Sequence, residues 1–463
     1  MFVTIKKRMV DIMDYNIFRA YDIRGVYPST INKDVSYTIG RAYGSYIREK
    51  LGKTFCVVSH DNRLSSEELS SFLIKGITES GCNVINYGLT TTPMNYYARY
   101  LNNSLGIMVT ASHNPKDDNG FKFSFDNLAN ARGEMITDFK NYVMAGKFLS
   151  GTGSVTNNDM VNKYIEYFKN GISMGPNRRK VIIDCGNGVT CTVARKIHEN
   201  FNIDFEVICE ENDGSFPNHH PDPNVEENLS MLKKKVLETK ADIGIAYDGD
   251  GDRVGIIDNE GKYVTTEEYM ILIIRDIINK VKNKTFLYDV KCSKSLEDEI
   301  LRLGGTPFCY RTGASYTQAK TKMDNLAFGG EYSGHIYFRD RVNDINSGIY
   351  AGLRLVEILS KTSDKLSDMT KNIPKYYHTP ELRIPVSDDK KFMVVEKIKE
   401  YAKSVNFQIN DIDGVRINFS NGWALIRASN TGPNLTVRVE ANDNDSMVRL
   451  KEFVLKLIDT YSK

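Results

Sequence analysis

Long hydrophobic runs are absent from this chain of 463 residues. Its most apolar stretch, Met270 to Ile278, is short and contains Arg275, whereas a membrane-spanning helix needs about 20 apolar residues. The first residues, "MFVTIKKRMVDIMDYN", also lack the apolar segment of a signal peptide. We therefore expect a cytoplasmic protein with no membrane partner.

The chain also lacks an excess of either charge. Lys and Arg number 61 and Asp and Glu number 59, for a net charge of +2, so a nucleic-acid partner is not expected. Any anionic ligand must be bound by local basic residues. With 41% hydrophobic residues, the chain can form several cores, and its length predicts two to four domains.

Cysteine pairs with metal-binding spacing are missing as well. The seven cysteines are Cys56, Cys82, Cys185, Cys191, Cys209, Cys292 and Cys309. Their number is odd, none forms a C-x-x-C pair, and several lie in apolar, strand-like runs. This pattern predicts reduced, mostly buried thiols rather than disulfides or zinc sites.

What the sequence does contain is a repeated alternation of strand and helix. In the first third, strand patterns at 54–60, 83–88 and 105–110 alternate with helix patterns at 65–81 and 91–103, which predicts a parallel sheet. The same order restarts near 180, with a helix expected over 190–201, and again near 242. The last part differs, with two strands and two flanking helices typical of a small α+β domain. We predict domains at 1–158, 159–259, 260–373 and 374–463, the first three being divergent copies of one unit.

The most distinctive motif is "YDGDGDRVG". Asp248, Asp250 and Asp252 alternate with glycines, and three carboxylates so close together repel one another unless a cation lies between them. An EF-hand does not fit, because its sixth and twelfth positions would be Arg253 and Asn259. Three oxygen ligands suit Mg²⁺, and an adjacent arginine can neutralise a phosphoryl group. The alternative is an acidic surface turn.

A second motif, "VTASHNP", follows a predicted core strand. Parallel sheets bind ligands at the carboxyl ends of their strands, so the Ser112 hydroxyl is expected to face the ligand. His113, Asn114 and Lys122 could bind or balance an anion there. Alone, the motif is equally consistent with a polar turn ended by Pro115; the acidic motif favours a serine that carries a phosphoryl group.

A third motif, "LIRASNTGP", lies between two strands of the C-terminal part. Arg427, Ser429, Asn430 and Thr431 supply a guanidinium, hydroxyl groups and backbone amides, which together suit a phosphate. A hairpin turn rich in Ser, Asn and Gly is the alternative.

A fourth motif, "GGEYSGHIYF", places Glu331, Ser333 and His335 at alternating positions. On an extended segment, these three side chains would share one face and could bind sugar hydroxyls. Tyr332 would then point away from that face. This motif is weak when taken alone.

Taken in this order, the motifs resemble the α-D-phosphohexomutase family, in particular its phosphomannomutase/phosphoglucomutase branch. The resemblance runs from "FRAYDIRG" through "TASHNP", "DGDGDR", "DVKCSKS" and "GEYSGH" to "RASNTGP", which is nearly the whole chain. It implies a heart-shaped protein with three related mixed α/β sheet domains and a C-terminal α+β domain around a central cleft.

The resemblance also implies roles for individual residues. Ser112 would be the phosphoserine, and its phosphate would complete a single Mg²⁺ site with Asp248, Asp250 and Asp252. The other catalytic residues implied are Arg24, His113, Lys122 and Arg253. The substrate-binding residues implied are Tyr21, Lys291, Glu331, Tyr332, Ser333, Gly334, His335, Arg427, Ala428, Ser429, Asn430 and Thr431.

The implied reaction interconverts hexose 1-phosphates and hexose 6-phosphates of mannose or glucose through a hexose 1,6-bisphosphate. Sugar phosphates are then the expected partners, and the protein is expected to be a monomer or a small homo-oligomer. The resemblance does not indicate which residue is the general base.

Two positions depart from the family pattern. Ala314 stands where this branch often has His, and Asn346-Ser347-Gly348 replaces the family's "DDG". Both affect the expected sugar preference. A phosphoglucosamine mutase is therefore a second interpretation, although that group tends to carry Gln at the position of Tyr332. A third is an inactive sugar-phosphate-binding protein that has kept the fold.

Overall fold

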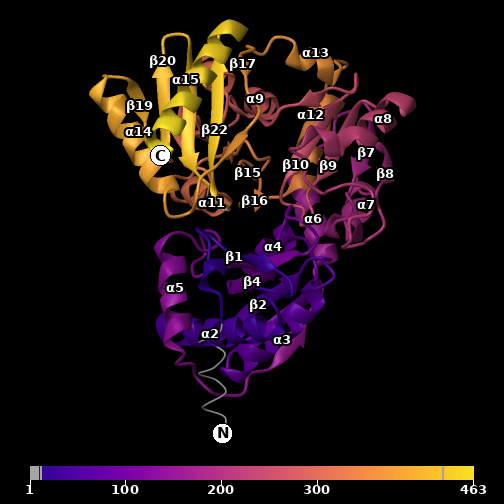
Figure 1. Cartoon of the computed structure of the whole chain (residues 1–463). Helices are drawn as coiled ribbons and strands as arrows, with labels where there is room; N and C mark the ends of the chain where they lie inside the picture. Colours follow the sequence, from indigo (N-terminus) through magenta and orange to yellow (C-terminus); the bar gives the residue numbers. More distant parts are fainter. Residues whose placement is uncertain (1–9, 11–12, 430–431) are drawn as a thin grey trace.

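The computed structural model describes residue 10 and residues 13–429 and 432–463. Four domains follow one another along the chain, from the indigo N-terminal domain through magenta and orange to the yellow C-terminal domain (Figure 1). Each is built on one sheet. Within the described part of the chain, no helix is both long enough and apolar enough to cross a membrane.

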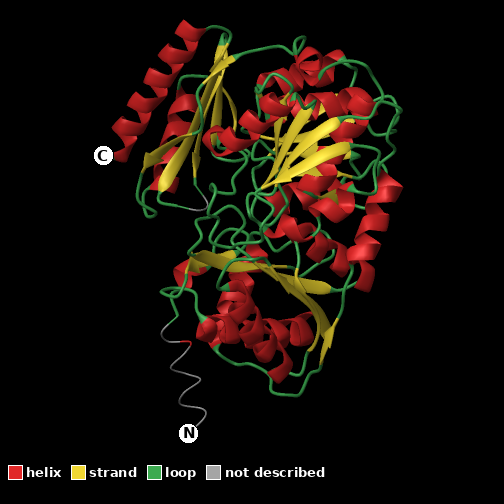
Figure 2. Cartoon of the chain, turned by 90° about the vertical axis from the view of Figure 1, so that its right-hand side faces the viewer, coloured by secondary structure: helices red, strands yellow, loops and turns green. Residues whose placement is uncertain are grey.

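Domain I has a six-stranded mixed sheet in the order β1-β5-β4-β2-β3-β6. Its elements are η1 (Tyr15–Ile17), β1 (Ile23–Val26), α2 (Lys33–Leu51), β2 (Phe55–His60), α3 (Ser66–Glu79), β3 (Asn83–Leu89), α4 (Thr92–Asn102), β4 (Leu105–Val109), β5 (Asp118–Phe123), α5 (Glu134–Ala145) and β6 (Val155–Asn157). The predicted parallel βαβαβ unit is present as β2, β3 and β4 with their helices. In Figure 2, helices lie below this sheet and loops connect it to the rest of the molecule.

Domain II has a five-stranded sheet in the order β11-β10-β9-β7-β8. Its elements are α6 (Val161–Gly171), β7 (Lys180–Asp184), η2 (Val189–Thr192), α7 (Ala194–His198), β8 (Asp204–Ile208), η3 (Glu226–Leu229), α8 (Ser230–Thr239), β9 (Ile243–Tyr247), β10 (Val254–Asp258) and β11 (Tyr263–Val264). The helix expected over 190–201 is instead a 3₁₀ turn and a short α-helix, because β-branched residues cluster at its start. Since β11 pairs with β10, the sheet extends slightly beyond the predicted boundary at 259; the three domain boundaries remain predictions.

Domain III repeats this plan with the strand order β13-β12-β14-β15-β16. Its elements are α9 (Thr266–Ile277), β12 (Thr285–Asp289), α10 (Lys294–Arg302), β13 (Thr306–Tyr310), α11 (Ala314–Met323), β14 (Phe328–Gly330), β15 (Ile336–Phe338), β16 (Ile345–Asn346), α12 (Gly348–Ser360) and α13 (Leu366–Thr370). Helix α9 begins with a capping box of Thr265 and Glu268. Arg275 is the charged residue within the apolar run of this helix, and it pairs with Glu299 at 2.7 Å.

Domain IV is an α+β domain, as expected, but its antiparallel sheet is larger than the two predicted strands. Its elements are β17 (Tyr377–His378), β18 (Leu382–Pro385), α14 (Lys391–Ser404), β19 (Gln408–Asn410), β20 (Val415–Phe419), β21 (Gly422–Ala428), β22 (Asn434–Ala441) and α15 (Asn444–Ser462). Short strands such as β17 and β19 carry too few residues to show an alternating pattern.

The sheets of domains I, II and III share one feature that positions the candidate site. In each, a parallel strand is followed by an antiparallel partner: β4 by β5, β9 by β10 and β14 by β15. The Ser112, Asp248 and Glu331 motifs occupy these three connections. The fold therefore places the motifs at equivalent points of three similar sheets.

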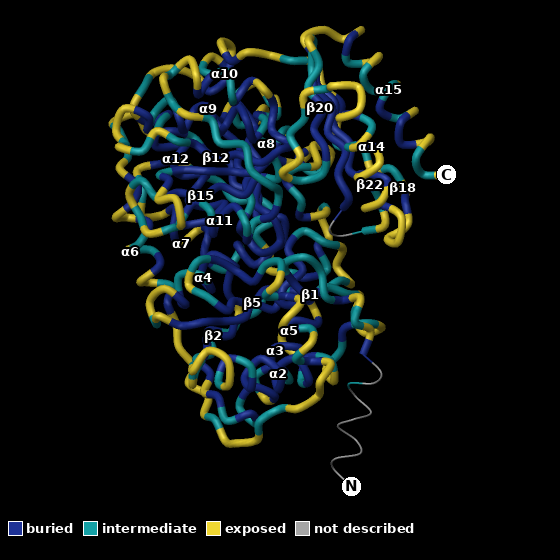
Figure 3. Tube along the Cα trace, turned by 90° about the vertical axis from the view of Figure 1, so that its left-hand side faces the viewer, coloured by how far each residue is buried: buried dark blue, intermediate teal, exposed yellow. Residues whose placement is uncertain are grey.

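The cores are divided unevenly among the domains. One buried hydrophobic cluster continues from domain II into domain III, whereas most of domain I and domain IV have clusters of their own. Figure 3 shows buried strands inside each domain and exposed segments at the periphery. Domain IV therefore shares less apolar packing with the rest of the chain than domains II and III share with each other.

Candidate active site

Ser112 lies just after β4 in an unusual backbone conformation. Its φ angle is 54°, a left-handed value that non-glycine residues adopt rarely and mostly at functional sites. The Ser112 amide donates to Thr110 Oγ1 at 2.8 Å, which helps to hold the turn. The residue is 1% exposed, and its carbonyl oxygen would lie 2.6 Å from a Cβ on Gly249. Glycine at 249 thus allows the loops of domains I and II to touch.

Arg63 supports the Ser112 loop through hydrogen bonds to its backbone. We did not predict this residue. Its guanidinium donates to the carbonyl oxygens of Ser112 and Asn114, both at 2.7 Å, and of Pro115 at 2.6 Å. Arg63 follows the carboxyl end of β2, where ligand-binding residues of parallel sheets gather. This position after a strand is the sequence feature that could have identified Arg63 as a site residue.

The three aspartates of the acidic motif converge in the turn between β9 and β10. They are at most 1% exposed, and one carboxylate oxygen of each lies within 4.8 Å of the others. Asp248 Oδ1 accepts hydrogen bonds from the amides of Gly251 and Arg253 at 3.1 and 3.0 Å. Asp248 Oδ2 accepts the Ser112 hydroxyl at 2.8 Å. The predicted strand–turn–strand context and the proximity of serine and acids are both present.

Lys122 on β5 balances part of this negative charge. Its Nζ lies 2.7 Å from Asp250 Oδ2 and 2.9 Å from Asp252 Oδ2. Burial opposes these charges, but the two carboxylates raise the pKa of Lys122 above its ordinary value. Burial likewise favours neutral Asp250, yet Lys122 and the Thr92 hydroxyl, at 2.6 Å, lower the pKa of Asp250. Thr92 was another residue missed by the sequence analysis.

The acidic triad has the properties of a cation site. Burial raises the pKa of Asp248 well above its usual range, and Asp250 and Asp252 raise it further. Among the described residues, Asp250 Oδ1 and Asp252 Oδ1 are buried and have no hydrogen-bond partner. Unpaired carboxylate oxygens are costly inside a protein unless a cation or proton satisfies them. An all-oxygen set of this kind fits a hard divalent cation such as Mg²⁺.

Arg253 links the acidic triad to domain III. Its Nε lies 3.9 Å from Asp248 Oδ2 and donates to His335 Nε2 at 3.2 Å. His335 Nδ1 therefore carries the hydrogen and faces the Asp252 carbonyl oxygen at 3.3 Å. Burial lowers the pKa of His335 to about 4; Asp252 opposes this shift, and Arg253 and Lys122 add to it. His335 is consequently neutral at pH 7.

Two of the remaining predicted residues of domain I, Arg24 and His113, contact the Ser112 loop. Arg24 donates to Asp22 Oδ2 at 2.7 Å, the Ala111 carbonyl at 2.7 Å and Asn114 Oδ1 at 2.8 Å. His113 Nδ1 is 3.4 Å from Ser112 Oγ. Burial and the nearby arginines lower the pKa of His113 well below its ordinary value. Tyr21 is half-buried, and burial raises its pKa, with a further contribution from Asp22.

The motif at 331–335 is a tight turn between β14 and β15, so the extended segment that we expected is wrong. The Glu331 carbonyl accepts the amide of Gly334, whose φ angle is 83°. Consequently Glu331 and His335 diverge: Glu331 Oε2 accepts the Gly313 amide at 3.1 Å, whereas His335 contacts Arg253. The Ser333 carbonyl accepts from Asn224.

Beside this turn, the ring of Tyr332 lies close to two cationic side chains, Lys291 and Arg438. Lys291 Nζ lies 5.2 Å from the Tyr332 ring centroid and 3.2 Å from Glu381 Oε2. The Arg438 guanidinium lies 4.2 Å from the centroid of the same ring. Tyr332 thus contacts two cations, neither of which is on its own turn.

The described part of the third motif includes Arg427, whose guanidinium can donate further hydrogen bonds. Arg427 Nε pairs with Asp413 Oδ2 at 3.0 Å, while Arg427 Nη2 is buried and has no hydrogen-bond partner among the described residues. Asp413 Oδ2 also accepts the amide of Thr312 in domain III at 3.1 Å. Ala428 ends β21, and the Ser429 carbonyl accepts Lys391 Nζ at 2.6 Å. Asn430 and Thr431 lie outside the described residues.

The two departures from the family pattern lie near the 331–335 turn. Ala314 begins α11, and its carbonyl accepts the Tyr337 hydroxyl at 3.1 Å. Asn346 Nδ2 is 3.4 Å from His335 Nδ1. Ser347 caps α12 by accepting the Tyr350 amide. Asn346 thus contacts the candidate site, whereas the Ser347 side chain serves the helix.

The Ser112 hydroxyl is bonded to one of three buried carboxylates, and Lys122 and Arg253 lie beside them. In a four-domain fold of this kind, that arrangement indicates a phosphohexomutase. Comparisons with known proteins agree. The family descriptions "Phosphoglucomutase/phosphomannomutase, alpha/beta/alpha" domains I, II and III match residues 15–148, 162–261 and 265–377, and the C-terminal domain of the same family matches 381–457.

Similar proteins cover nearly the whole chain. The phosphomannomutase/phosphoglucomutase of Pseudomonas syringae pv. tomato is 40% identical over 445 residues, which are 95% of this chain and 94% of that protein. A phosphoglucomutase of Neisseria gonorrhoeae is 36% identical over 96% of this chain and 97% of that protein. The crystal structure of a phosphoglucomutase/phosphomannomutase family protein from Burkholderia thailandensis has a TM-score of 0.90 and 33% identity, and covers 97% of this chain and 98% of that one. The chain belongs to the phosphoglucomutase/phosphomannomutase family.

Proposed function

We propose that this protein interconverts hexose 1-phosphates and hexose 6-phosphates of mannose and glucose, with Ser112 as the phosphoryl carrier. The observation that carries the proposal is the bond of the Ser112 hydroxyl to Asp248 inside the acidic triad, with Lys122 and Arg253 adjacent. A serine with no catalytic role has no need of a strained backbone and three buried carboxylates.

The transfer requires charge stabilisation more than covalent chemistry. The bond from phosphorus to Ser112 Oγ breaks as a bond from phosphorus to a sugar hydroxyl oxygen forms, and negative charge spreads over the phosphoryl oxygens. Arg253 and Lys122 would stabilise that charge. Mg²⁺, held by Asp248, Asp250 and Asp252, would when bound supply a Lewis acid for the phosphoserine oxygens.

Proton transfer needs a group that is neutral at working pH. The sugar hydroxyl loses its proton as it attacks, and Ser112 Oγ gains one as it leaves. His113 lies next to Ser112 Oγ, and its pKa is lowered by burial and by Arg253 and Arg24. A neutral imidazole can accept a proton, so we assign His113 to taking the proton from Ser112 Oγ when the serine attacks phosphorus in the return half-reaction; the donor to Ser112 Oγ as it leaves is not assigned. The base for the sugar hydroxyl is not assigned.

Substrate binding would divide between domains III and IV. Glu331 would accept hydrogen bonds from sugar hydroxyls, and Tyr21 and Lys291 would border the sugar. Arg427, with the loop of residues 428–431, would bind the phosphate that does not react. One such phosphate site can serve both half-reactions if the hexose 1,6-bisphosphate intermediate turns around between them.

A coupled assay tests this function. Mannose 1-phosphate and glucose 1-phosphate, with a trace of glucose 1,6-bisphosphate, should yield the corresponding 6-phosphates only when Mg²⁺ is present. Intact-mass measurement should find about one phosphate per chain. No conversion of any hexose phosphate would favour an inactive binding protein, and conversion of glucosamine phosphate alone would favour a phosphoglucosamine mutase.

A further inference from the structure

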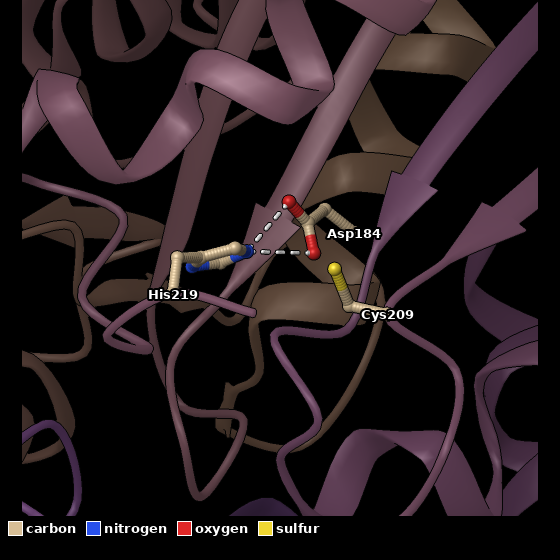
Figure 4. Close-up of side chains that lie close together, drawn as sticks. All are labelled: Asp184, Cys209 and His219. Carbon is tan, nitrogen blue, oxygen red and sulfur yellow. Dashed lines mark hydrogen bonds and ion pairs between the residues drawn. The ribbon is translucent and has the colours of Figure 1, made fainter. Parts of the chain in front are cut away.

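We propose that Asp184, Cys209 and His219 form a second cation site, specific for a borderline-soft divalent ion of the Zn²⁺ type. Asp184 ends β7, Cys209 follows β8, and His219 lies on the segment between β8 and η3. Strands β7 and β8 are parallel neighbours, so their carboxyl ends meet at one edge of the sheet. Figure 4 shows the three side chains directed toward one another.

The ligand atoms have the spacing that a tetrahedral ion requires. His219 Nε2 lies 3.0 and 3.2 Å from the two Asp184 oxygens. A carboxylate oxygen, the Cys209 Sγ and a histidine nitrogen lie within 4.8 Å of one another. Zn²⁺ binds nitrogen, oxygen and sulfur at about 2.0–2.3 Å, which separates tetrahedral ligands by roughly 3.2–3.7 Å. Only small movements would place all three around one ion.

The hydrogen bonds of His219 place its Nε2 against the Asp184 carboxylate, a contact that needs a proton or a metal ion between the two groups. His219 Nδ1 lies 3.0 Å from the His220 carbonyl oxygen, which can only accept, so Nδ1 carries a hydrogen. In a neutral ring, the Nε2 lone pair would then point at the buried Asp184 carboxylate. That arrangement is repulsive unless a proton or a metal lies between them. A backbone carbonyl on the other nitrogen is also the usual support of a metal-binding histidine.

Cys209 supplies a third ligand atom. An imidazolium on His219 can bond to Asp184 and to Cys209, whereas a divalent cation would bind all three side chains at once. Cys209 has a φ angle of 47°, unusual for a residue other than glycine, and its carbonyl accepts the Asn187 amide at 2.9 Å. The backbone is therefore fixed in the conformation that turns this side chain toward Asp184.

The donor set separates this site from the acidic triad. Asp248, Asp250 and Asp252 offer only oxygen, which hard Mg²⁺ prefers, whereas sulfur, nitrogen and oxygen together select Zn²⁺ or a similar transition-metal ion. His219 is 12% exposed at its side chain and Cys209 is half-buried. Water can therefore occupy the fourth position around the ion.

A cation here would also tether the segment beside the candidate active site. Pro221 approaches the positions of Gly186 and Gly249, and Asp222 lies 4.0 Å from Arg253. Binding of the metal would thus limit movement of the segment that faces Arg253. The proposed cation site itself does not depend on the mutase function, because it is tested by metal binding alone.

The test is a Co²⁺ titration of the purified full-length protein in excess Mg²⁺, which occupies oxygen-only sites. We expect one Co²⁺ per chain with a thiolate-to-cobalt charge-transfer band in the near ultraviolet. Cys209→Ser should abolish the band, and His219→Gln should weaken binding by at least about tenfold. Cys309→Ser, which changes a half-buried thiol in domain III, should behave as the wild type.

A second measurement uses only the wild type, so it tests the proposal even if a variant fails to fold. Zn²⁺ should slow alkylation of Cys209 by iodoacetamide at least about tenfold and leave alkylation of Cys309 unchanged, as read by peptide mass. A wild type without the cobalt band, a band that persists in Cys209→Ser, or alkylation of Cys209 insensitive to Zn²⁺ would overturn the proposal. In those cases His219 and Asp184 form only an imidazolium–carboxylate pair.

Discussion

The Ser112 hydroxyl donates to Asp248 Oδ2 at 2.8 Å, although 136 residues separate the two along the chain. The contact joins the β4–β5 connection of domain I to the β9–β10 connection of domain II. Both residues are almost completely buried, so the serine lies within an anionic site and not on a free turn.

Removal of the serine hydroxyl is expected to stop the reaction. Ser112→Ala should reduce kcat by at least about a thousandfold, because no residue is left to carry the phosphoryl group between the two half-reactions. Its intact mass should also lack the phosphate of the wild type. Ser154→Ala, which changes an exposed serine of the same domain, should retain both activity and phosphate. Wild-type turnover in Ser112→Ala would exclude Ser112 as the carrier.

Removal of one negative charge from the triad should weaken metal binding. Asp250→Asn should require at least about tenfold more Mg²⁺ for half-maximal activity, because Mg²⁺ binds through few carboxylates and depends strongly on each. A Mg²⁺ titration of initial rates gives this value. Asp213→Asn, a change outside the triad, is the matched control. Full activity of the wild type after dialysis against EDTA would contradict the metal role.

Much of the site could be predicted because its motifs occupy the ends of strands. The pattern of apolar strands identifies β2, β3 and β4, and a polar residue at a strand end must face the ligand-binding edge. The acids of the β9–β10 turn need no knowledge of the fold, since their mutual repulsion favours a cation over an acidic surface turn. Such local signals led to Ser112, Asp248 and Arg253.

Other parts of the site depend on contacts that no local pattern encodes. Arg63 binds three carbonyls of the Ser112 loop, and Asp413 bridges Arg427 and domain III, yet each is one charged residue in a polar segment. The turn of Glu331 was misread because its two-residue alternation also suits an extended segment. The Asp184, Cys209 and His219 cluster joins residues with no motif spacing, and sequence reasoning had disfavoured zinc.

The charge state of Glu331 should make stability depend on pH. Burial, with Asp289, raises the pKa of Glu331 to about 7 from an ordinary value of 4.5. A carboxyl group with a raised pKa stabilises the folded state below pH 4.5, and this contribution is lost as pH rises to 7. At about 1.4 kcal/mol per pKa unit, the loss is about 3 kcal/mol.

Thermal unfolding of Glu331→Gln tests this dependence. Between pH 5 and 8, the midpoint for the wild type should fall relative to that of the variant, which cannot ionise at this position. Glu400→Gln, at an exposed site, should follow the wild type at every pH. Parallel curves for the wild type and Glu331→Gln would show that Glu331 titrates at its ordinary pKa.

Domain IV is expected to close on a bisphosphate. Its main core is distinct from that of domain III, which it meets at a small cluster of Val290, Trp423 and Leu425. Arg427 Nη2 has no hydrogen-bond partner among the described residues, so a phosphate can supply new contacts on closure. Small-angle scattering should show a smaller radius of gyration with glucose 1,6-bisphosphate, and hydrogen exchange near Arg427 should slow. Glucose without phosphate should change neither. Identical profiles with and without the bisphosphate would count against closure.

The sugar preference should be broad at C2. Mannose and glucose differ only there, and a site that binds shared hydroxyls accepts both epimers. Glu331 is the acceptor that the turn provides, while Tyr332 contacts Lys291 and Arg438 and adds no carboxylate for an amine. We therefore expect kcat/KM for mannose 1-phosphate and glucose 1-phosphate to agree within roughly tenfold, about 1.4 kcal/mol, and glucosamine 1-phosphate to be distinctly poorer.

Ala314→His, which restores the residue common in this branch, tests whether that position shifts the preference. A clear preference of the wild type for glucosamine 1-phosphate would overturn the substrate assignment and leave the role of Ser112 intact.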